Sequence, residues 1–196
     1  MKLQHIGLGI AAILPATAFA SQETYKKYAP DLVFGLDAPH LHLLTNHIPI
    51  FVTFSGLIVM GIALWKRDHL ARQIALILVS VGNAGALVTY WLGQQSYKAV
   101  RGLADESGQG WLDLHMERAE QVVWLYWLAL IVSVAALVWC WRGRRFTALA
   151  TWGATVLAVV SLGLAGWIAD AGGKIRHSEF RGVEPAPEAE EAPHSH

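Results

Sequence analysis

Residues 43–65, LLTNHIPIFVTFSGLIVMGIALW, contain no Asp, Glu, Lys or Arg. A helix needs about 20 apolar residues to cross the hydrocarbon core of a bilayer, and this segment is long enough. Inside a bilayer the backbone polar groups must be hydrogen-bonded within the segment, so each such segment should be helical. Three further segments share this character: Gln73 to Leu92, Val122 to Trp141 and Phe146 to Ile168. The sequence therefore predicts an all-α, polytopic membrane protein whose domain is a four-transmembrane-helix bundle.

The N-terminus has the pattern of a secretory signal. Lys2 precedes an apolar run over residues 6–13, and the small residues Ala18 and Ala20 stand ahead of Ser21. A charged start, a short apolar centre and an A-x-A site predict a cleavable signal peptide over residues 1–20. An uncleaved fifth helix is the alternative, and it gives the same topology. We then expect a periplasmic segment at 21–38, a transmembrane domain at 39–180 with helices at about 39–65, 73–93, 112–141 and 146–169, and a disordered periplasmic tail at 181–196.

The basic residues of the two short loops predict the orientation. Lys and Arg accumulate in cytoplasmic loops of membrane proteins. The other connections hold fourteen of the fifteen acidic residues, and Asp68 is the exception. We therefore expect a bacterial inner-membrane protein with both termini in the periplasm. The loop cations are Lys66, Arg67, Arg72, Arg142, Arg144 and Arg145.

The amino-acid composition argues against several classes of function. Of the residues 54% are hydrophobic, and 15 Lys and Arg balance 15 Asp and Glu. The balanced charge gives no electrostatic basis for binding nucleic acid, so the lipid bilayer is the expected partner. The single cysteine, Cys140, forms no internal disulfide and no thiolate metal site by itself. No Ser or Cys stands beside a base in a catalytic motif, which argues against an enzyme.

Side-chain spacing predicts how the helices pack. On the first helix, polar and small residues form one stripe that should face the bundle, and Asn83 is their polar counterpart on the second helix. Tryptophans near the helix ends are expected to anchor at the headgroup level. The stripe consists of Asn46, Pro49, Thr53, Gly56 and Met60, and the anchors are Trp65, Trp139, Trp141 and Trp152 at one interface with Trp91, Trp111 and Trp167 at the other.

Apart from His194 and His196 in the tail, five histidines lie on the predicted outer side. Neutral imidazole is a common metal ligand and an axial ligand of haem iron. With about 1.5 Å of rise per residue, His115 lies at the height of His40 or His42, and a bend at Pro49 leaves His47 open as well. The candidate cofactor ligands are His47, His115 and His177, and the candidate metal ligands are His40, His42, His115 and His177.

Other residues are expected to support this cluster. Asp37 is a suitable N-cap for the first helix, with Pro39 in its first turn. Two glycines, Gly172 and Gly173, are expected to end the fourth helix and let the chain fold back over the bundle. Carboxylates and polar groups near the histidines are candidates to orient the ligands. They are Glu117, Glu179, Arg176 and Asn46.

Four segments carry a family resemblance: LHLLTNHIPI at 41–50, YWLGQ at 90–94, LHMERA at 114–119 and GGKIRHSE at 172–179. They resemble an uncharacterised family of small bacterial inner-membrane proteins, domain-of-unknown-function family 2231. The resemblance spans residues 39–180 and implies a four-helix protein with a His followed by Pro at the first helix and a His–acid pair before the third. Here Met116 follows His115, so the acid comes one position later, at Glu117. The resemblance marks His47, His115 and His177 and implies no reaction.

Three functions are compatible with these features. The leading hypothesis is membrane electron transfer, with a b-type haem or a metal near the outer face and the quinone pool and a periplasmic electron carrier as partners. The second is a non-catalytic accessory or assembly subunit of a larger respiratory membrane complex. The third is a periplasm-facing protein that binds a divalent metal.

Overall fold

The structure, a computed structural model, describes residues 25–29, 31–143 and 147–182. The predicted signal peptide at 1–20 lies outside these residues, and so does the predicted disordered tail at 181–196 except for residues 181 and 182. A short helical turn at 25–28 comes first, and a two-stranded antiparallel hairpin follows it, made of β1 (Asp31–Val33) and β2 (Leu36–Asp37). The helices follow in the order α2 (Ala38–Thr45), α3 (Ile48–Lys66), α4 (His69–Arg101), α5 (Glu106–Trp141), α6 (Thr147–Lys174) and the 3₁₀ turn η1 (Ser178–Phe180).

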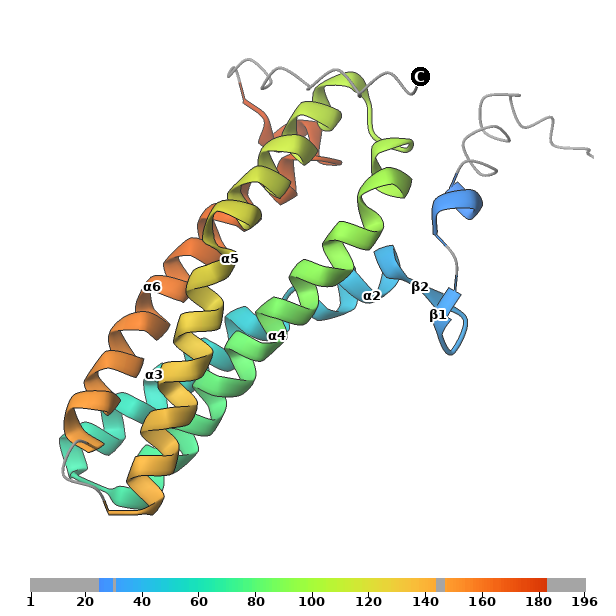
Figure 1. The fold of residues 1–196 in the computed structure, drawn as a ribbon. Helices are drawn as coiled ribbons and strands as arrows, with labels where there is room; N and C mark the ends of the chain where they lie inside the picture. Colours follow the sequence, from blue (N-terminus) through green and yellow to red (C-terminus); the bar gives the residue numbers. More distant parts are fainter. Residues whose placement is uncertain (1–24, 30, 144–146, 183–196) are drawn as a thin grey trace, which may run out of the picture.

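Within the described residues, four helical segments are long and apolar enough to cross a membrane: α2 together with α3, and α4, α5 and α6. Figure 1 shows α3, α4, α5 and α6 running along one another, with the β-hairpin beside α2. Large apolar side chains such as Phe51, Ile58 and Val156 point out of the bundle and are more than half exposed. Lipid covers such a surface, whereas a soluble protein rarely exposes it. The predicted all-α membrane bundle is confirmed, and the chain is a multi-pass membrane protein.

The helices α4 and α5 extend further than their apolar segments. α4 continues to Arg101 and α5 begins at Glu106, so the predicted boundaries at 93 and 112 are wrong. Hydropathy locates the part of a helix that lies in lipid, and polar contacts stabilise the parts beyond it. The Tyr97 hydroxyl donates a 2.5 Å hydrogen bond to Asp113, and Arg101 pairs with the same carboxylate. The predicted outer connection is therefore largely helical.

The first membrane segment is two helices, whereas the sequence predicts one. Asp37 caps α2 as predicted, because its carboxylate accepts from the His40 backbone N–H at 3.0 Å. The helix then breaks at residues 46–47, and Pro49 stands in the first turn of α3. Proline has no N–H to donate to the preceding turn. The carbonyl oxygen of Thr45 accepts from the Thr89 hydroxyl of α4 instead, at 3.3 Å.

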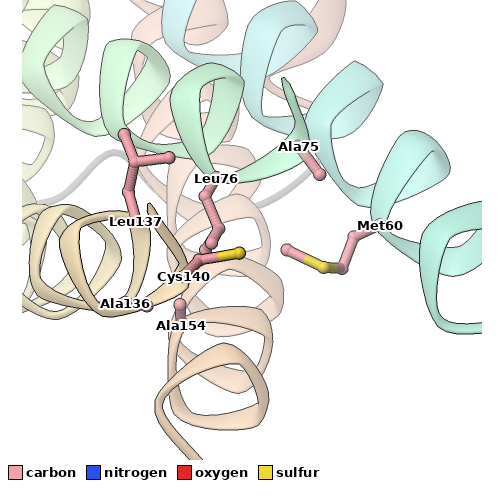
Figure 2. Close-up of a cluster of buried hydrophobic side chains, with 7 residues drawn as sticks. All are labelled: Met60, Ala75, Leu76, Ala136, Leu137, Cys140 and Ala154. Atoms are coloured by element: carbon pink, nitrogen blue, oxygen red, sulfur yellow. The ribbon is translucent and has the colours of Figure 1, made fainter. Parts of the chain in front are cut away.

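The bundle has two chemically different ends. We call the end with Lys66, Arg67 and Arg142 the basic end, and the end with α2 and the start of α5 the histidine end. A compact apolar cluster from α3, α4, α5 and α6 fills the core toward the basic end (Figure 2). Its buried members are Met60, Ala75, Leu76, Ala136, Leu137, Cys140 and Ala154.

The predicted packing stripe of the first segment is buried against α4. Pro49, Thr53, Gly56 and Met60 are all buried, as the spacing predicts. The backbones approach closely here, since a Cβ placed on Gly82 would lie 2.9 Å from the Thr53 nitrogen. Small residues allow such contact, and packing of this kind drives helix association in lipid.

One predicted interfacial tryptophan lies inside the protein. Trp111 is only 4% exposed and packs with Leu112, Ala171 and Ile175 between α5 and α6. The prediction that it anchors at the headgroup level is wrong, because α5 begins before it and α6 continues past it to Lys174. The two helices therefore enclose this ring.

Candidate functional site: a histidine pair between two hairpins

Two histidines meet at the histidine end, one from the first helical hairpin (α2 and α3 with α4) and one from the second (α5 with α6). His42 of α2 and His115 of α5 have ring centroids 6.4 Å apart, and the ring planes are nearly perpendicular at 88°. Both side chains are partly buried. The height estimate that pairs His115 with His40 or His42 agrees with this contact. We call the two residues the histidine pair.

A backbone carbonyl of the neighbouring helix holds each imidazole of the pair. The Nδ1 atom of His42 lies 3.0 Å from the carbonyl oxygen of Thr89 on α4. The Nδ1 atom of His115 lies 2.9 Å from the carbonyl oxygen of Ile168 on α6. A carbonyl oxygen only accepts, so Nδ1 of each ring carries the proton and donates it. In a neutral imidazole the lone pair is then on Nε2.

The Nε2 atoms are the ligand atoms that this arrangement leaves available. Among residues 25–29, 31–143 and 147–182, no hydrogen bond joins a protein group to Nε2 of either ring. A histidine that binds a metal through Nε2 commonly donates its other N–H to a carbonyl or carboxylate, which fixes the ring. The histidine pair has this arrangement twice.

A glycine one turn beyond each accepting carbonyl makes room for the ring. A Cβ placed on Gly93 would lie 3.2 Å from Cε1 of His42. A Cβ placed on Gly172 would lie 3.0 Å from both Cε1 and Nδ1 of His115. Both distances are tighter than ordinary van der Waals contact, so any larger residue would push on the imidazole.

This packing also corrects the expected role of the glycine pair. The sequence predicts that Gly172 and Gly173 end the fourth helix, but α6 continues through them to Lys174. Glycine is unfavourable within a helix by roughly 0.5–1 kcal/mol relative to alanine. At Gly172 the close approach of His115 accounts for its presence.

His40 and His47 point to other partners. The ring of His40 lies 2.7 Å from the Asp37 carboxylate at the start of α2. Burial acts to raise the pKa of Asp37, but hydrogen bonds from the His40 backbone, the Tyr25 hydroxyl and the His40 ring lower it below the ordinary value. His47 stands in the break before α3, is exposed, and stacks on Phe51 with centroids 6.4 Å apart. Neither residue is joined to the histidine pair by a side-chain contact within the described chain.

His177 lies in the exposed segment after α6. Its Nδ1 is 2.9 Å from the Glu179 carboxylate, and its ring packs on Phe180 at 5.1 Å between centroids. Arg176 beside it donates to the carbonyl oxygen of Leu103 at 2.5 Å. These contacts fold the segment onto the turn between α4 and α5.

The predicted supporting residues do not hydrogen-bond to either ring. Glu117 is exposed and accepts from Gln121 at 2.8 Å, whereas Ile168 supplies the acceptor for His115. Asn46 continues the turn of α2, with its backbone N–H on the His42 carbonyl oxygen, and its buried Oδ1 has no hydrogen-bond partner among the described residues.

An arginine closes the histidine end above the pair. Arg181 forms two hydrogen bonds of 2.8 and 2.9 Å with Asp105, which also caps α5. This hydrogen bonding lowers the pKa of Asp105 below its ordinary value, and the Gly108 backbone N–H adds to the effect. The segment after α6 is thereby tied to the start of α5. A cavity of about 200 Å³ remains beside it, lined by Leu103, Asp105, Ile175, Arg176 and Arg181.

The residues that position the pair are ones that sequence reasoning missed. Thr89, Gly93, Ile168 and Gly172 carry no chemical signature, since two act through backbone carbonyls and two through the lack of a side chain. The available signal is a glycine four residues after the accepting position on each returning helix, in TYWLG and IADAG. This spacing can be recognised as a signal only when the facing histidine is known.

Comparison with known proteins adds no relative. No family model, no curated protein and no solved structure matches the chain. The resemblance to domain-of-unknown-function family 2231 therefore stays a prediction, and the site has to be judged by its own chemistry.

Proposed function

We propose that this protein binds a b-type haem in the membrane through His42 and His115 and takes part in membrane electron transfer. The observation that carries the proposal is the histidine pair, with one imidazole from each hairpin at the same depth and each fixed through Nδ1. Facing histidines on separate helices are a common way for helical bundles to hold a cofactor in their core.

The spacing of the rings fits axial ligation. Two imidazoles bound to opposite sides of one iron, each through a bond of about 2 Å, have ring centres about 6 Å apart. The centroids of His42 and His115 are 6.4 Å apart. Axial ligation sets no fixed angle between the two ring planes, so 88° is compatible with it.

The number of protein ligands favours a haem over a bare divalent ion. Among residues 25–29, 31–143 and 147–182, no group of three or more His, Cys, Asp or Glu is placed to hold a metal. Zinc sites use three or four protein ligands. A porphyrin supplies four nitrogens itself and needs only the two axial imidazoles that the pair provides.

The surrounding residues have defined tasks at such a site. The carbonyls of Thr89 and Ile168 hold the Nδ1 protons, so the unprotonated Nε2 atoms are kept for the iron. The glycines permit the Cε1–Nδ1 edge of each ring to approach the neighbouring helix closely. A bound haem supplies an iron that carries one electron by changing between the ferric and ferrous states. The same two carbonyls would hold the imidazoles in place around a bound iron.

Charge distribution gives the expected orientation. The cations of the basic end, Lys66, Arg67, Arg72 and Arg142, favour the cytoplasmic side of a bacterial inner membrane. The histidine end then faces the periplasm, where a soluble electron carrier has access to it. The quinone pool within the bilayer is the natural second partner.

The first test is the visible spectrum of the full-length protein, purified in detergent from haem-replete cells. We expect sharp bands of a low-spin haem b in the dithionite-reduced minus oxidised spectrum, and iron in elemental analysis of the same sample. A colourless protein that also takes up no added haemin would contradict the proposal. Chelator-sensitive zinc or copper in a colourless sample would favour the divalent-metal function instead.

A further inference from the structure

The turn of the β-hairpin presents an aromatic side chain to its surroundings. Val33 pairs with Leu36, so Phe34 and Gly35 form the turn. Phe34 is 98% exposed, and its neighbours Leu32 and Val33 are also classed among the exposed apolar residues. Single exposed apolar residues are ordinary, but several that adjoin at the tip of a projecting element indicate an interaction site.

The backbone of this turn is unfavourable for phenylalanine. Both turn residues have positive φ, 51° at Phe34 and 74° at Gly35. Two-residue hairpin turns of this kind favour Asn, Asp or Gly in the first position, because a bulky side chain is strained in the left-handed region. Within the described chain almost nothing covers the ring in return. A partner outside the chain therefore explains an aromatic residue at this position.

The β-hairpin lies at the level where the bundle leaves the hydrocarbon core. The apolar segment of α4 ends at Leu92, and the Thr89 carbonyl oxygen that holds His42 lies one turn before that end. Ala38, the first residue of α2, precedes His42 by four residues, which is at most about 6 Å of rise. The headgroup layer outside the core is roughly 5–7 Å thick on each side. The β-hairpin directly precedes Ala38 and therefore lies at headgroup level.

The surface beside the β-hairpin is continuous with the lipid-facing surface of the bundle. Figure 1 shows β1 and β2 beside α2, to the side of the four long helices. Leu43 and Leu44 of α2 are both more than half exposed, and so is Phe51 on α3. Lipid covers such side chains on the membrane-spanning helices. An apolar turn that projects beside them at the same level meets the same lipid.

Two exposed lysines accompany the apolar turn. Lys26 and Lys27 lie on the helical turn at 25–28. The Tyr25 hydroxyl donates a 2.7 Å hydrogen bond to Asp37, which ties this helical turn to the end of β2. Elements that lie in a membrane interface combine apolar side chains, which enter the boundary of the acyl chains, with Lys or Arg, which contact the phosphates. Both kinds of side chain are present here.

We infer that the β-hairpin is a membrane anchor whose turn, at Phe34, inserts into the headgroup region next to α2. The partner is the phospholipid of the bilayer, with Phe34 at the edge of the acyl chains and Lys26 and Lys27 toward the phosphates. The anchor goes beyond the proposed function and does not depend on a haem. It holds α2 from the lipid side, while Thr89 holds His42 from the side of the bundle.

The test measures whether lipid reaches the turn. Val33→Cys, in a chain that also carries Cys140→Ala, is labelled with an environment-sensitive dye. The full-length protein is reconstituted into vesicles of phosphatidylcholine and phosphatidylglycerol, with and without a nitroxide-labelled phospholipid. We expect the nitroxide to quench this dye nearly as strongly as a dye at Phe51→Cys. A dye at Glu106→Cys, which is exposed at the start of α5 beyond the apolar segment, should stay unquenched.

Phe34→Ser tests the residue itself. The change should lower the equilibrium constant for insertion by about tenfold, the worth of moving a phenyl ring from an apolar phase into water. Quenching at Val33→Cys should fall accordingly. The dye at Phe51→Cys should keep its quenching in the same variant, which shows that the bundle still spans the bilayer.

Three results would overturn the inference. The first is quenching at Val33→Cys no greater than at Glu106→Cys. The second is unchanged quenching at Val33→Cys in Phe34→Ser. The third is a dye that is shielded from water but not quenched, with shielding that rises with the amount of protein per vesicle, since a second copy of the chain would then cover the turn.

Discussion

The two hairpins of the bundle present a histidine in the same way from different backbones. In the first hairpin His42 lies on the short helix α2, which is separated from α3 by a break at residues 46–47. In the second, His115 lies within the uninterrupted α5. Yet each ring donates to a carbonyl of the returning helix, with a glycine one turn further along. The returning helix therefore sets the position of each imidazole, and the helix that carries it is free to vary.

The hairpins differ in how they secure the turn after the histidine. Three residues after His42, the Thr45 carbonyl oxygen accepts a 3.3 Å bond from the Thr89 hydroxyl. Three residues after His115, Arg118 donates to the Trp167 carbonyl oxygen at 2.6 Å. The first contact joins two neutral groups, whereas the second is made by a charged guanidinium group.

Enlarging the two glycines should have the largest effect on the site. We expect Gly172→Val and Gly93→Val each to lower the haem content at least tenfold, because the new side chain occupies the space of an imidazole. With alanine the loss should be greater at Gly172, where the Cβ distance is 3.0 Å, than at Gly93, where it is 3.2 Å. The haem content per protein chain, measured as the pyridine complex of the haem, checks the predictions for the valine and the alanine variants.

Gly163 on α6 is the control for that series, since a Cβ placed there would have nothing within 4 Å. Gly163→Val should retain the haem. Equal loss in Gly163→Val would show that any added bulk on α6 disrupts binding, and the specific role of the two site glycines would be wrong.

A smaller effect is expected where α3 and α4 touch. Gly82→Ala places a methyl group against the Thr53 backbone, and overpacking of this kind costs about 1–3 kcal/mol. Gly163→Ala meets open space and should be neutral or slightly stabilising, since alanine favours a helix. Thermal unfolding of both variants in detergent measures the difference. A Gly82→Ala protein as stable as wild type would contradict the close contact.

We expect the smallest effect on thermal stability, and a dependence on pH, at the contact between Arg181 and Asp105, which the first hairpin lacks. The pKa of Asp105 is lowered below its ordinary value of 3.8, first by the hydrogen bonds from Arg181. A lowered pKa stabilises the folded state above the ordinary value, and the contribution is lost as the pH falls through the folded pKa. Arg181→Met should therefore unfold at a lower temperature than wild type at pH 7. Below pH 3.8 the difference should shrink to the part that comes from the hydrogen bonds of Arg181 to the Lys174 and Ile175 carbonyl oxygens. A difference that is independent of pH would exclude a contribution from Asp105.

Patterns in the sequence are sufficient to predict the fold and one histidine of the site, His115. The lack of charge in each span predicts four helices, the stripe from Pro49 to Met60 predicts the face toward α4, and Asp37 predicts the first cap. Rise per residue places His115 at the height of His40 or His42, without deciding between them. These features depend on position along one helix, which spacing alone determines.

The remaining features depend on contacts between helices. The rise per residue gives the height of a side chain along the helix axis but not its direction around that axis, so it leaves His47 open as a ligand. In the structure the helix breaks before Pro49, and His47 lies in the turn between α2 and α3. The carbonyls of Thr89 and Ile168 are the same chemical group as every other backbone carbonyl. Trp111 has the pattern of an interfacial anchor because hydropathy does not reveal how far α5 and α6 extend together.

Haem content in three alanine variants tests the central claim most directly. His42→Ala and His115→Ala should each lose the low-spin bands of haem b, because one axial ligand is then missing from either hairpin. His47→Ala should keep them in full, since His47 packs on Phe51 and not on the pair. Retention of a wild-type spectrum in both His42→Ala and His115→Ala, or its loss in His47→Ala alone, would contradict the account.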